Sequence, residues 1–331
     1  MKLFISGYGG GESNSIGLYD VGVDCRKKEL LWASNVEASS YLSYHDNLLF
    51  GITEKGSGCW VYMFIGKGDG YSLVDSRELN SDILCHISYL PKSRALVGSC
   101  YGSGEVFSIG VGDQGFKELL CTLRQGDRDD IESRAHCGVP DAEEKRLYSA
   151  NIALDRIYIY DINKGMLSER EYFQLNRGEG PRHIALYPEL DLIYIITEYS
   201  NRIITIHMGK EGLKIVQSIS TLPEGFQGQS YCSTLCLTKD KKYLYAANRG
   251  SNTIGIFKVR DDGLLEKISH SDCFGNWPRH IDLIGGDNYI AITNERSDQV
   301  VIVQRDSETG QIKDVVNRID FKRPGFVVEK L

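Results

Sequence analysis

Short runs of tyrosine and β-branched residues recur along the whole chain, and Gly, Asn and Asp separate them. Runs of this kind, bounded by turn-forming residues, are typical of short β-strands. No stretch follows a helical period for more than a few turns. The pattern therefore predicts an all-β protein built from many short strands.

These strands form a repeat, which becomes visible when the chain is aligned with itself. Each unit contains a short strand, a turn, a second strand that ends in a polar residue, another turn and a third strand, and a more variable fourth strand follows. From Cys85 onward the units are roughly 46 to 51 residues apart. That length is typical of one four-stranded blade of a β-propeller, which packs its two faces on its neighbours. The complete units begin near residues 40, 85, 135, 181, 232 and 278.

The two ends of the chain supply one further blade. Residues 325–331 (GFVVEKL) have the pattern of the innermost strand of a unit, whereas LFISGY, SIGLYDV and ELLWAS near the N-terminus have the patterns of the other three. Joining the ends leaves no free edge in the ring. We therefore predict a seven-bladed β-propeller of four-stranded antiparallel blades. It forms a single domain over residues 1–331, and its closing blade combines about 325–331 with 1–33.

The start of a blade's first strand and the end of its second strand lie on the same rim of the channel, because these strands are antiparallel. In this chain both positions are rich in polar residues, which predicts a pocket for a small ligand at that rim. The start of the first strand carries His86, His136, Arg182, His183, Thr234, Arg279 and His280. The end of the second strand carries Glu54, Tyr101, Asn151, Glu198, Arg249 and Glu295.

Polar residues at this rim also have a structural explanation, because a propeller channel holds water and polar side chains tie neighbouring blades together. Three of the residues are arginines, namely Arg182, Arg249 and Arg279. Clustering cations is unfavourable unless carboxylates or a bound anion offset their charge. The cluster therefore favours a pocket for an anionic small molecule.

Composition changes this picture only by excluding partners. With 38 basic and 45 acidic residues the net charge is −7, so general binding to nucleic acid or to an anionic membrane is not expected. No apolar run approaches the roughly 18 residues of a membrane-spanning helix, and the start MKLFISGYGG lacks the pattern of a signal peptide. The nine cysteines are scattered and include no CxxC pair, which predicts unpaired thiols in a reducing cytoplasm.

Other segments give weaker signals. The glycine-rich residues 7–13 (GYGGGES) lack the Lys and Ser/Thr of a phosphate loop and precede a strand. No HExxH or GxSxG motif occurs in the sequence. The loops 124–135 and 223–231 connect blades, and they either cover a ligand at the rim or are solvated connections.

At the rim residues the sequence resembles the lactonase family of seven-bladed propellers, which includes a bacterial type of 6-phosphogluconolactonase and the fungal carboxy-cis,cis-muconate cyclases. The similarity covers essentially the whole chain, and the GPRH sequence at 180–183 followed by Glu198 is a fairly specific signature. It is strongest in residues 178–201, 241–259, 276–283 and 135–162. The resemblance implies an active site that contains His136, Arg182, Glu198 and Arg249.

The reaction that this resemblance implies is hydrolysis of a sugar lactone, with 6-phosphoglucono-1,5-lactone as the leading substrate. Such an activated ester requires a base for water and cations that stabilise the tetrahedral oxyanion. Glu198 is the expected base and His136 the alternative, while Arg182 and Arg249 would bind the oxyanion or the substrate anion. The expected substrate-binding residues are His86, Tyr101, Asn151, His183, Arg279, His280, Glu54 and Glu295.

We expect no metal or other cofactor, and the expected partner is a small anionic lactone in the cytoplasm, within the pentose phosphate pathway. One alternative is a lactonase or cycloisomerase for another acidic lactone, such as a muconolactone. The other is a non-catalytic propeller that binds a small anion or a protein. The sequence leaves the oligomeric state open, and a monomer is compatible with it.

Overall fold

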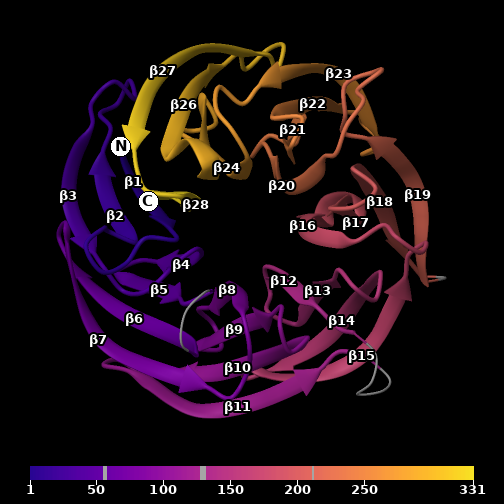
Figure 1. The fold of residues 1–331 in the computed structure, drawn as a ribbon. Coiled ribbons are helices and arrows are strands. Elements are labelled where there is room, and N and C mark those ends of the chain that lie inside the picture. The colour runs from indigo at the N-terminus through magenta and orange to yellow at the C-terminus, as the bar shows by residue number, and fades with distance from the viewer. Residues whose placement is uncertain (55–57, 127–131, 211) are drawn as a thin grey trace. The chain divides into compact units, whose positions relative to one another are not determined.

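The computed structural model describes residues 1–54, 58–126, 132–210 and 212–331. In these ranges the chain forms strands β1 to β28 and two 3-10 helices of three residues each, η1 (Pro188–Leu190) and η2 (Glu295–Ser297). The strands form seven sheets of four strands (Figure 1). The prediction of an all-β, seven-bladed propeller with four-stranded antiparallel blades is confirmed.

Six of the sheets are meanders of four consecutive strands. Three of them come before residue 180: β4 (Leu42–His45), β5 (Leu48–Ile52), β6 (Cys59–Lys67) and β7 (Gly70–Leu79); β8 (Leu84–Leu90), β9 (Ala95–Cys100), β10 (Glu105–Val111) and β11 (Phe116–Arg124); β12 (Ala135–Pro140), β13 (Arg146–Asn151), β14 (Arg156–Asn163) and β15 (Met166–Gln174). The other three are β16 (Pro181–Tyr187), β17 (Leu192–Thr197), β18 (Arg202–Gly209) and β19 (Gly212–Ser220); β20 (Tyr231–Leu237), β21 (Tyr243–Arg249), β22 (Thr253–Val259) and β23 (Leu265–Asp272); β24 (Pro278–Ile284), β25 (Tyr289–Asn294), β26 (Gln299–Arg305) and β27 (Ile312–Asp320).

The remaining sheet joins the two ends of the chain. Its order is β28 (Pro324–Lys330), β1 (Lys2–Gly7), β2 (Ile16–Asp20) and β3 (Glu29–Ser34). Figure 1 shows β28 beside β1, next to the two marked termini. The predicted pairing of the N- and C-terminal strands is therefore confirmed.

The described chain divides into two compact units. One, here called the C-terminal unit, comprises Met1–Ile5, Leu18–Leu30 and Arg182–Lys330. The other, here called the N-terminal unit, comprises Ser6–Gly17, Leu31–Pro181 and Leu331. The single domain over residues 1–331 stays a prediction.

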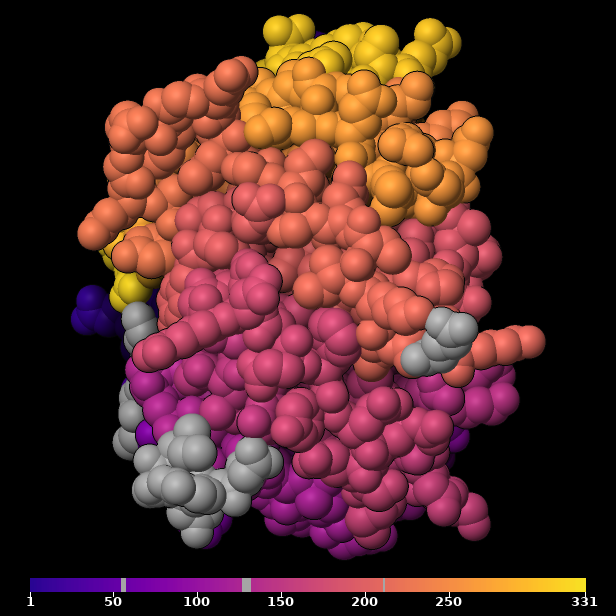
Figure 2. Space-filling view, turned by 90° about the vertical axis from the view of Figure 1, so that its right-hand side faces the viewer, coloured from indigo at the N-terminus to yellow at the C-terminus, as the bar shows by residue number. Residues whose placement is uncertain are grey.

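Apolar packing between successive sheets holds the C-terminal unit together. Strand β17 (LIYIIT) is buried over its whole length, because both faces of its sheet are covered. Tyr194 and Ile196 of β17 share a buried cluster with Leu244 and Phe257 of the next sheet. The fourth strands of the sheets are more exposed, as in β19. In Figure 2 the orange part of the chain, which includes the fourth strand β23, lies at the surface.

The first strands of the sheets in the C-terminal unit lie next to one another, and β24 packs against β20 and β28. At their starts the Nη1 of Arg182 in β16 donates a hydrogen bond to the carbonyl of Ser233 in β20. The hydroxyl of Ser233 donates in turn to the carbonyl of Pro278 in β24, at 2.6 Å. This arrangement gathers the beginnings of three successive first strands, and it positions the candidate site.

In the described part of the chain, no helix has both the length and the hydrophobicity needed to cross a lipid bilayer. The cysteines that the structure describes form no disulfide bond.

Candidate active site

Three predicted residues of the C-terminal unit meet in one cluster of ion pairs. The carboxylate oxygen Oε2 of Glu198, just after β17, lies 3.0 Å from Nε of Arg182 and 3.0 Å from Nη2 of Arg249. Both arginines are almost fully buried, with side chains 4% and 7% exposed, whereas the Glu198 side chain is 18% exposed. The opening to solvent therefore lies at the carboxylate.

Backbone carbonyls fix the orientation of both guanidinium groups. Arg249, at the end of β21, donates from Nη2 to the carbonyl of Cys232 at 2.8 Å and from Nε to that of Tyr231 at 3.3 Å. Arg182 is held by Glu198 and by the carbonyl of Ser233. A guanidinium with several fixed acceptors loses little further freedom when it binds a ligand, so the cluster is preorganised.

Trp277 supports Arg249 from one side. The guanidinium carbon of Arg249 lies 5.6 Å from the centre of the Trp277 ring, and that of Arg296 lies 3.4 Å from it. Trp277 adopts φ 66°, a left-handed conformation that is unfavourable for a bulky residue. Strained residues of this kind cluster at functional sites, where the surrounding contacts maintain them.

The electrostatics of Glu198 follow from the competition between burial and charge. Burial alone would raise its pKa, but the charges of Arg249, Arg182 and Arg279 outweigh that effect and hold the pKa below its ordinary value of 4.5. Glu198 is therefore ionised at neutral pH. Both arginines contact Oε2, and among the residues that the structure describes no group donates to Oε1. Oε1 is thus the atom available to a water molecule or a substrate.

A second cluster lies around Glu295 in the same unit. Its Oε1 accepts a hydrogen bond from Nη2 of Arg323 at 2.7 Å, and its Oε2 lies 4.0 Å from Nε of Arg279. The sequence predicted Arg279 and Glu295 at this rim but not Arg323. Arg323 precedes β28 and lies outside residues 325–331, which the sequence assigned to the closing blade.

The predicted histidines of this unit are packed rather than open. His183 is 7% exposed and His280 is 9% exposed. The His280 ring lies 4.3 Å from the ring of Phe326 in β28 and packs β24 against that strand. Their substrate-binding role stays a prediction.

The remaining predicted residues belong to the N-terminal unit. The rings of His136 and Tyr101 meet edge to face with their centres 6.1 Å apart, and Nη1 of Arg134 donates to the Tyr101 hydroxyl at 2.7 Å. His136 is 6% exposed. Its role as the alternative base stays a prediction.

Two further predicted residues of the N-terminal unit have partners within it. The His86 ring lies 4.4 Å from the ring of Tyr41, and its Nδ1 accepts a hydrogen bond from the Gly138 amide at 3.4 Å. The Glu54 carboxylate accepts hydrogen bonds from the hydroxyls of Tyr8, at 2.7 Å, and Ser40.

Asn151 forms hydrogen bonds within its own unit. Its side chain is fully buried and donates to Oε1 of Gln125 at 2.8 Å and to the Ser133 hydroxyl at 2.9 Å. Its carbonyl oxygen accepts hydrogen bonds from the amides of Arg134 and Leu154, each at 3.1 Å. Asn151 therefore stabilises the end of its blade, and its substrate-binding role stays a prediction.

Strand pairing places Asn151 one position earlier in its unit than the sequence alignment did, because Asn151 pairs with Ala135 as Asn294, not Glu295, pairs with Pro278. The pairing skips one residue between Ala135 and Cys137, between Leu84 and His86, and between Pro278 and His280. His136 is therefore equivalent to Arg279 and not, as the alignment assumed, to His86 and His280. A bulge re-aims one side chain, and bulges are common beside active sites.

The loop of residues 223–231 leads from β19 to β20. The end of this loop is attached next to Arg249, because the Ser230 hydroxyl donates to the Arg249 carbonyl at 3.0 Å and its carbonyl accepts from Asn201 at 2.8 Å. Gly250 adopts φ 96°, and a Cβ there would lie 2.3 Å from the Gln229 carbonyl oxygen, so only glycine fits. Of the loop 124–135, residues 127–131 lie outside the described residues.

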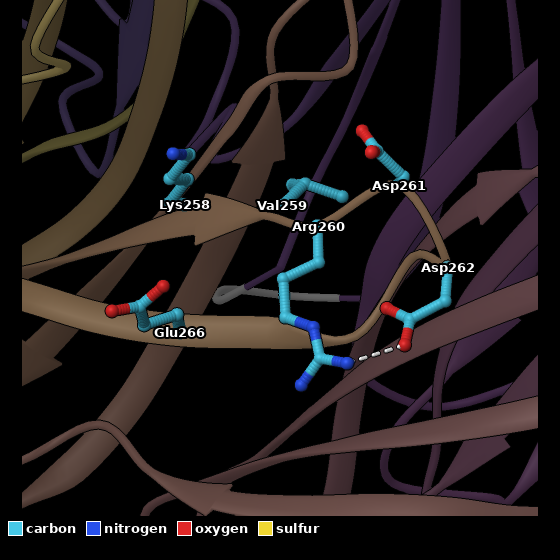
Figure 3. A pocket seen from close by; sticks show the side chains of 6 residues that line it. All are labelled: Lys258, Val259, Arg260, Asp261, Asp262 and Glu266. Carbon is cyan, nitrogen blue, oxygen red and sulfur yellow. Dashed lines mark hydrogen bonds and ion pairs between the residues drawn. The ribbon is translucent and has the colours of Figure 1, made fainter.

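A separate hollow of about 390 Å³ lies at the turn between β22 and β23 (Figure 3). It is lined by Lys258, Val259, Arg260, Asp261, Asp262 and Glu266, and Arg260 pairs with Asp262 at 2.6 Å. Strand β22 starts near Arg249 and ends at this turn, so its length of roughly 20 Å separates the hollow from the Glu198 cluster. In the described part of the chain no group of three His, Cys, Asp or Glu side chains is placed to hold a metal ion.

Comparisons with known proteins agree with this fold. Residues 2–329 match the family described as "Lactonase, 7-bladed beta-propeller". A 6-phosphogluconolactonase of Bacillus subtilis is 26% identical over 91% of this chain and 90% of that protein. An uncharacterised protein of Staphylococcus epidermidis is 28% identical over 84% of each chain.

Two solved structures share the fold at low sequence identity. A periplasmic gluconolactonase of Pseudomonas aeruginosa superposes with a TM-score of 0.89 at 20% identity, over 99% of this chain and 98% of that one. A protein from Lactobacillus plantarum superposes with a TM-score of 0.91 at 18% identity, over 98% of each chain.

Proposed function

This chain belongs to the lactonase family of seven-bladed β-propellers, and we propose that it hydrolyses a phosphorylated or otherwise acidic sugar lactone, with 6-phosphoglucono-1,5-lactone as the favoured substrate. The name of the Bacillus subtilis relative supports this substrate. The observation that carries the proposal is the cluster in which two buried arginines hold Oε2 of Glu198 and leave Oε1 open.

The proposed reaction adds water across the ester bond of the lactone. Oε1 of Glu198 removes a proton from a water molecule, whose oxygen attacks the carbonyl carbon. The carbonyl oxygen becomes an oxyanion, and Nη1 of Arg249, which contacts no protein acceptor among the described residues, is placed to stabilise it. The intermediate collapses with cleavage of the bond between the carbonyl carbon and the ring oxygen. The ring oxygen then takes up the proton that Glu198 had removed from the water molecule.

The lowered pKa of Glu198 makes it a weak base that is ionised at neutral pH. A weak base is sufficient here because the lactone is an activated ester. An anionic substrate that binds Arg182 or Arg249 brings a negative charge close to Glu198 and offsets part of the positive charge of the arginines. This would raise the pKa of Glu198 and make it a stronger base. The substrate thus increases the reactivity of the site that binds it.

The phosphorylated substrate also supports a cytoplasmic location. A phosphate ester carries one to two negative charges at neutral pH, and charged groups do not cross a bilayer unaided. An enzyme for such a lactone therefore has to share the compartment in which the lactone is made.

The test of the proposal is the rate at which the protein hydrolyses freshly made 6-phosphoglucono-1,5-lactone, measured by coupling the product to 6-phosphogluconate dehydrogenase. The lactone opens spontaneously, so the rate is compared with a reaction that lacks the protein at the same pH. We expect a clear excess over this background. A folded protein that adds nothing to it, but opens a muconolactone, would move the assignment to the other acidic lactones; activity on neither would favour a binding role.

A further inference from the structure

The cluster around Glu295 is distinct from the one around Glu198. Arg323 donates to Oε1 of Glu295 at 2.7 Å, whereas Nε of Arg279 lies 4.0 Å from Oε2, beyond hydrogen-bond distance. Glu295 is 11% exposed, Arg279 16% and Arg323 41%. The cluster thus combines one nearly buried carboxylate with two guanidinium groups, of which Arg323 is the more accessible.

The two clusters bring four guanidinium groups together in a chain whose net charge is −7. Arg182 and Arg249 lie beside Glu198, and Arg279 and Arg323 lie beside Glu295. The clusters adjoin, because the charge of Arg279 acts on Glu198 as well as on Glu295. Guanidinium groups gathered in this way are suited to binding a phosphate dianion.

The backbone at Arg323 indicates that its position is maintained at some cost. Arg323 adopts φ 44°, in the left-handed region, and precedes Pro324 just as Trp277 with φ 66° precedes Pro278. Its amide donates to Oδ1 of Asp298 at 2.8 Å, which fixes the turn. A non-glycine residue in this region is unfavourable, and such strain is typical of functional segments.

The repeat supplies an independent observation. The motif Pro-Arg-His occurs at 181–183 and 278–280, where its arginines are Arg182 and Arg279, whereas β28 begins Pro-Gly-Phe at 324–326. Gly325 therefore stands where the other two strands carry a cation. In this blade Arg323 supplies the guanidinium instead, from two residues earlier in the chain.

On the basis of the proposed function, we propose that Arg279 and Arg323 form a subsite for the phosphoryl dianion of the substrate, and that Arg323 determines the preference for a phosphorylated lactone. Planar guanidinium groups bind phosphate oxygens through two parallel hydrogen bonds. Arg323 then leaves Glu295 for the phosphoryl group, while Glu198 and Arg249 act on the lactone ring.

Binding of reaction products tests this subsite without requiring turnover. Calorimetry would measure the affinities of 6-phosphogluconate and gluconate for the wild-type chain, Arg323→Met, Arg323→Lys and the matched control Lys322→Met. Lys322 lies in the same loop and pairs with Asp298, so its loss changes the net charge equally. In Arg323→Met we expect the affinity for 6-phosphogluconate to fall roughly tenfold and that for gluconate to stay unchanged. Arg323→Lys should recover part of the loss, and Lys322→Met should bind like wild type.

Other results would overturn the subsite. One is that the wild-type chain binds 6-phosphogluconate and gluconate with equal affinity. Another is that Arg323→Met loses the same affinity for both products. A third is that Lys322→Met loses as much affinity for 6-phosphogluconate as Arg323→Met does. The proposed lactonase reaction fails separately. If the wild-type chain shows Arg323-dependent binding of 6-phosphogluconate but no lactone hydrolysis, the reaction is wrong and the subsite stands. If the wild-type chain hydrolyses 6-phosphoglucono-1,5-lactone and the unphosphorylated glucono-1,5-lactone equally well, the subsite is wrong and the reaction stands.

Discussion

Glu198 is held as a carboxylate by two arginines, and backbone carbonyls hold the arginines in turn. The sequence predicted that these three residues lie at one rim, because Arg182 and Glu198 occur in one motif and Arg249 occupies in the next unit the position that Glu198 has in its own. It did not predict that both arginines contact the same oxygen. That detail depends on the carbonyls of Ser233 and Cys232, which no residue pattern encodes.

Replacing Glu198 by Gln should lower the free energy of unfolding by about 1–3 kcal/mol at neutral pH, because two buried arginines then share a neutral oxygen. The pKa of Glu198 in the folded chain lies below its ordinary value of 4.5. Its ionised form therefore stabilises the folded chain above that value, and this contribution is lost as the pH falls through the lowered pKa.

Urea unfolding of both proteins over an acidic pH series would measure this effect. The difference in stability should shrink as the pH falls below 4.5, because the carboxylate is then protonated first in the unfolded chain and, at its lowered pKa, also in the folded chain. A difference that stays constant over the series would contradict the ion-pair account.

Trp277 is expected to position Arg249 through its ring. Trp277→Leu should reduce kcat/KM for the lactone about 2- to 30-fold, the range that corresponds to a cation–π interaction of 0.5–2 kcal/mol. Trp277→Phe, which keeps an aromatic face, should lose less. Steady-state kinetics of the two variants, with thermal unfolding as a control for folding, would check this; equal losses in both variants would argue against the ring interaction.

At the scale of elements, the strand pattern and the repeat predicted the blades, but not their registers. The alignment set His136 against His86 and His280, whereas strand pairing makes it equivalent to Arg279, one position earlier in the unit. His136 and Asn151 were each misplaced by one position for this reason. The prediction of Arg279 was unaffected, because the sequence placed Arg279 and His280 at the rim together.

Asn151 is buried, and its hydrogen bonds in the structure stabilise the end of its blade. Asn151→Ala should lower the free energy of unfolding by about 1–3 kcal/mol, because Gln125 and Ser133 lose a buried partner. It should leave KM for the lactone unchanged. Urea unfolding and steady-state kinetics on the same sample would measure both, and a raised KM at unchanged stability would restore Asn151 to the binding site.

At the scale of the whole molecule, one sheet depends on both ends of the chain. The sequence predicted this sheet because residues 325–331 have the pattern of a first strand without the other three. Without β28, strand β1 would expose an unpaired edge and the apolar cluster that Val327 shares with Leu3 and Ile5.

A chain that lacks residues 324–331 should therefore unfold at a lower temperature and aggregate, whereas removal of Leu331 alone, which is 88% exposed, should have little effect. Thermal unfolding and size-exclusion chromatography of both truncated chains would measure this. A chain without β28 that melts like the full-length protein would contradict the closing role of this strand.

The central claim is that the Glu198 cluster hydrolyses an acidic lactone. Its most direct test measures turnover of 6-phosphoglucono-1,5-lactone and binding of 6-phosphogluconate for the wild-type chain and Glu198→Gln at one pH. The account predicts that turnover falls at least about 100-fold in the variant, the lower range for loss of a general base, while the product still binds. An unchanged rate above background in a folded Glu198→Gln protein would contradict it.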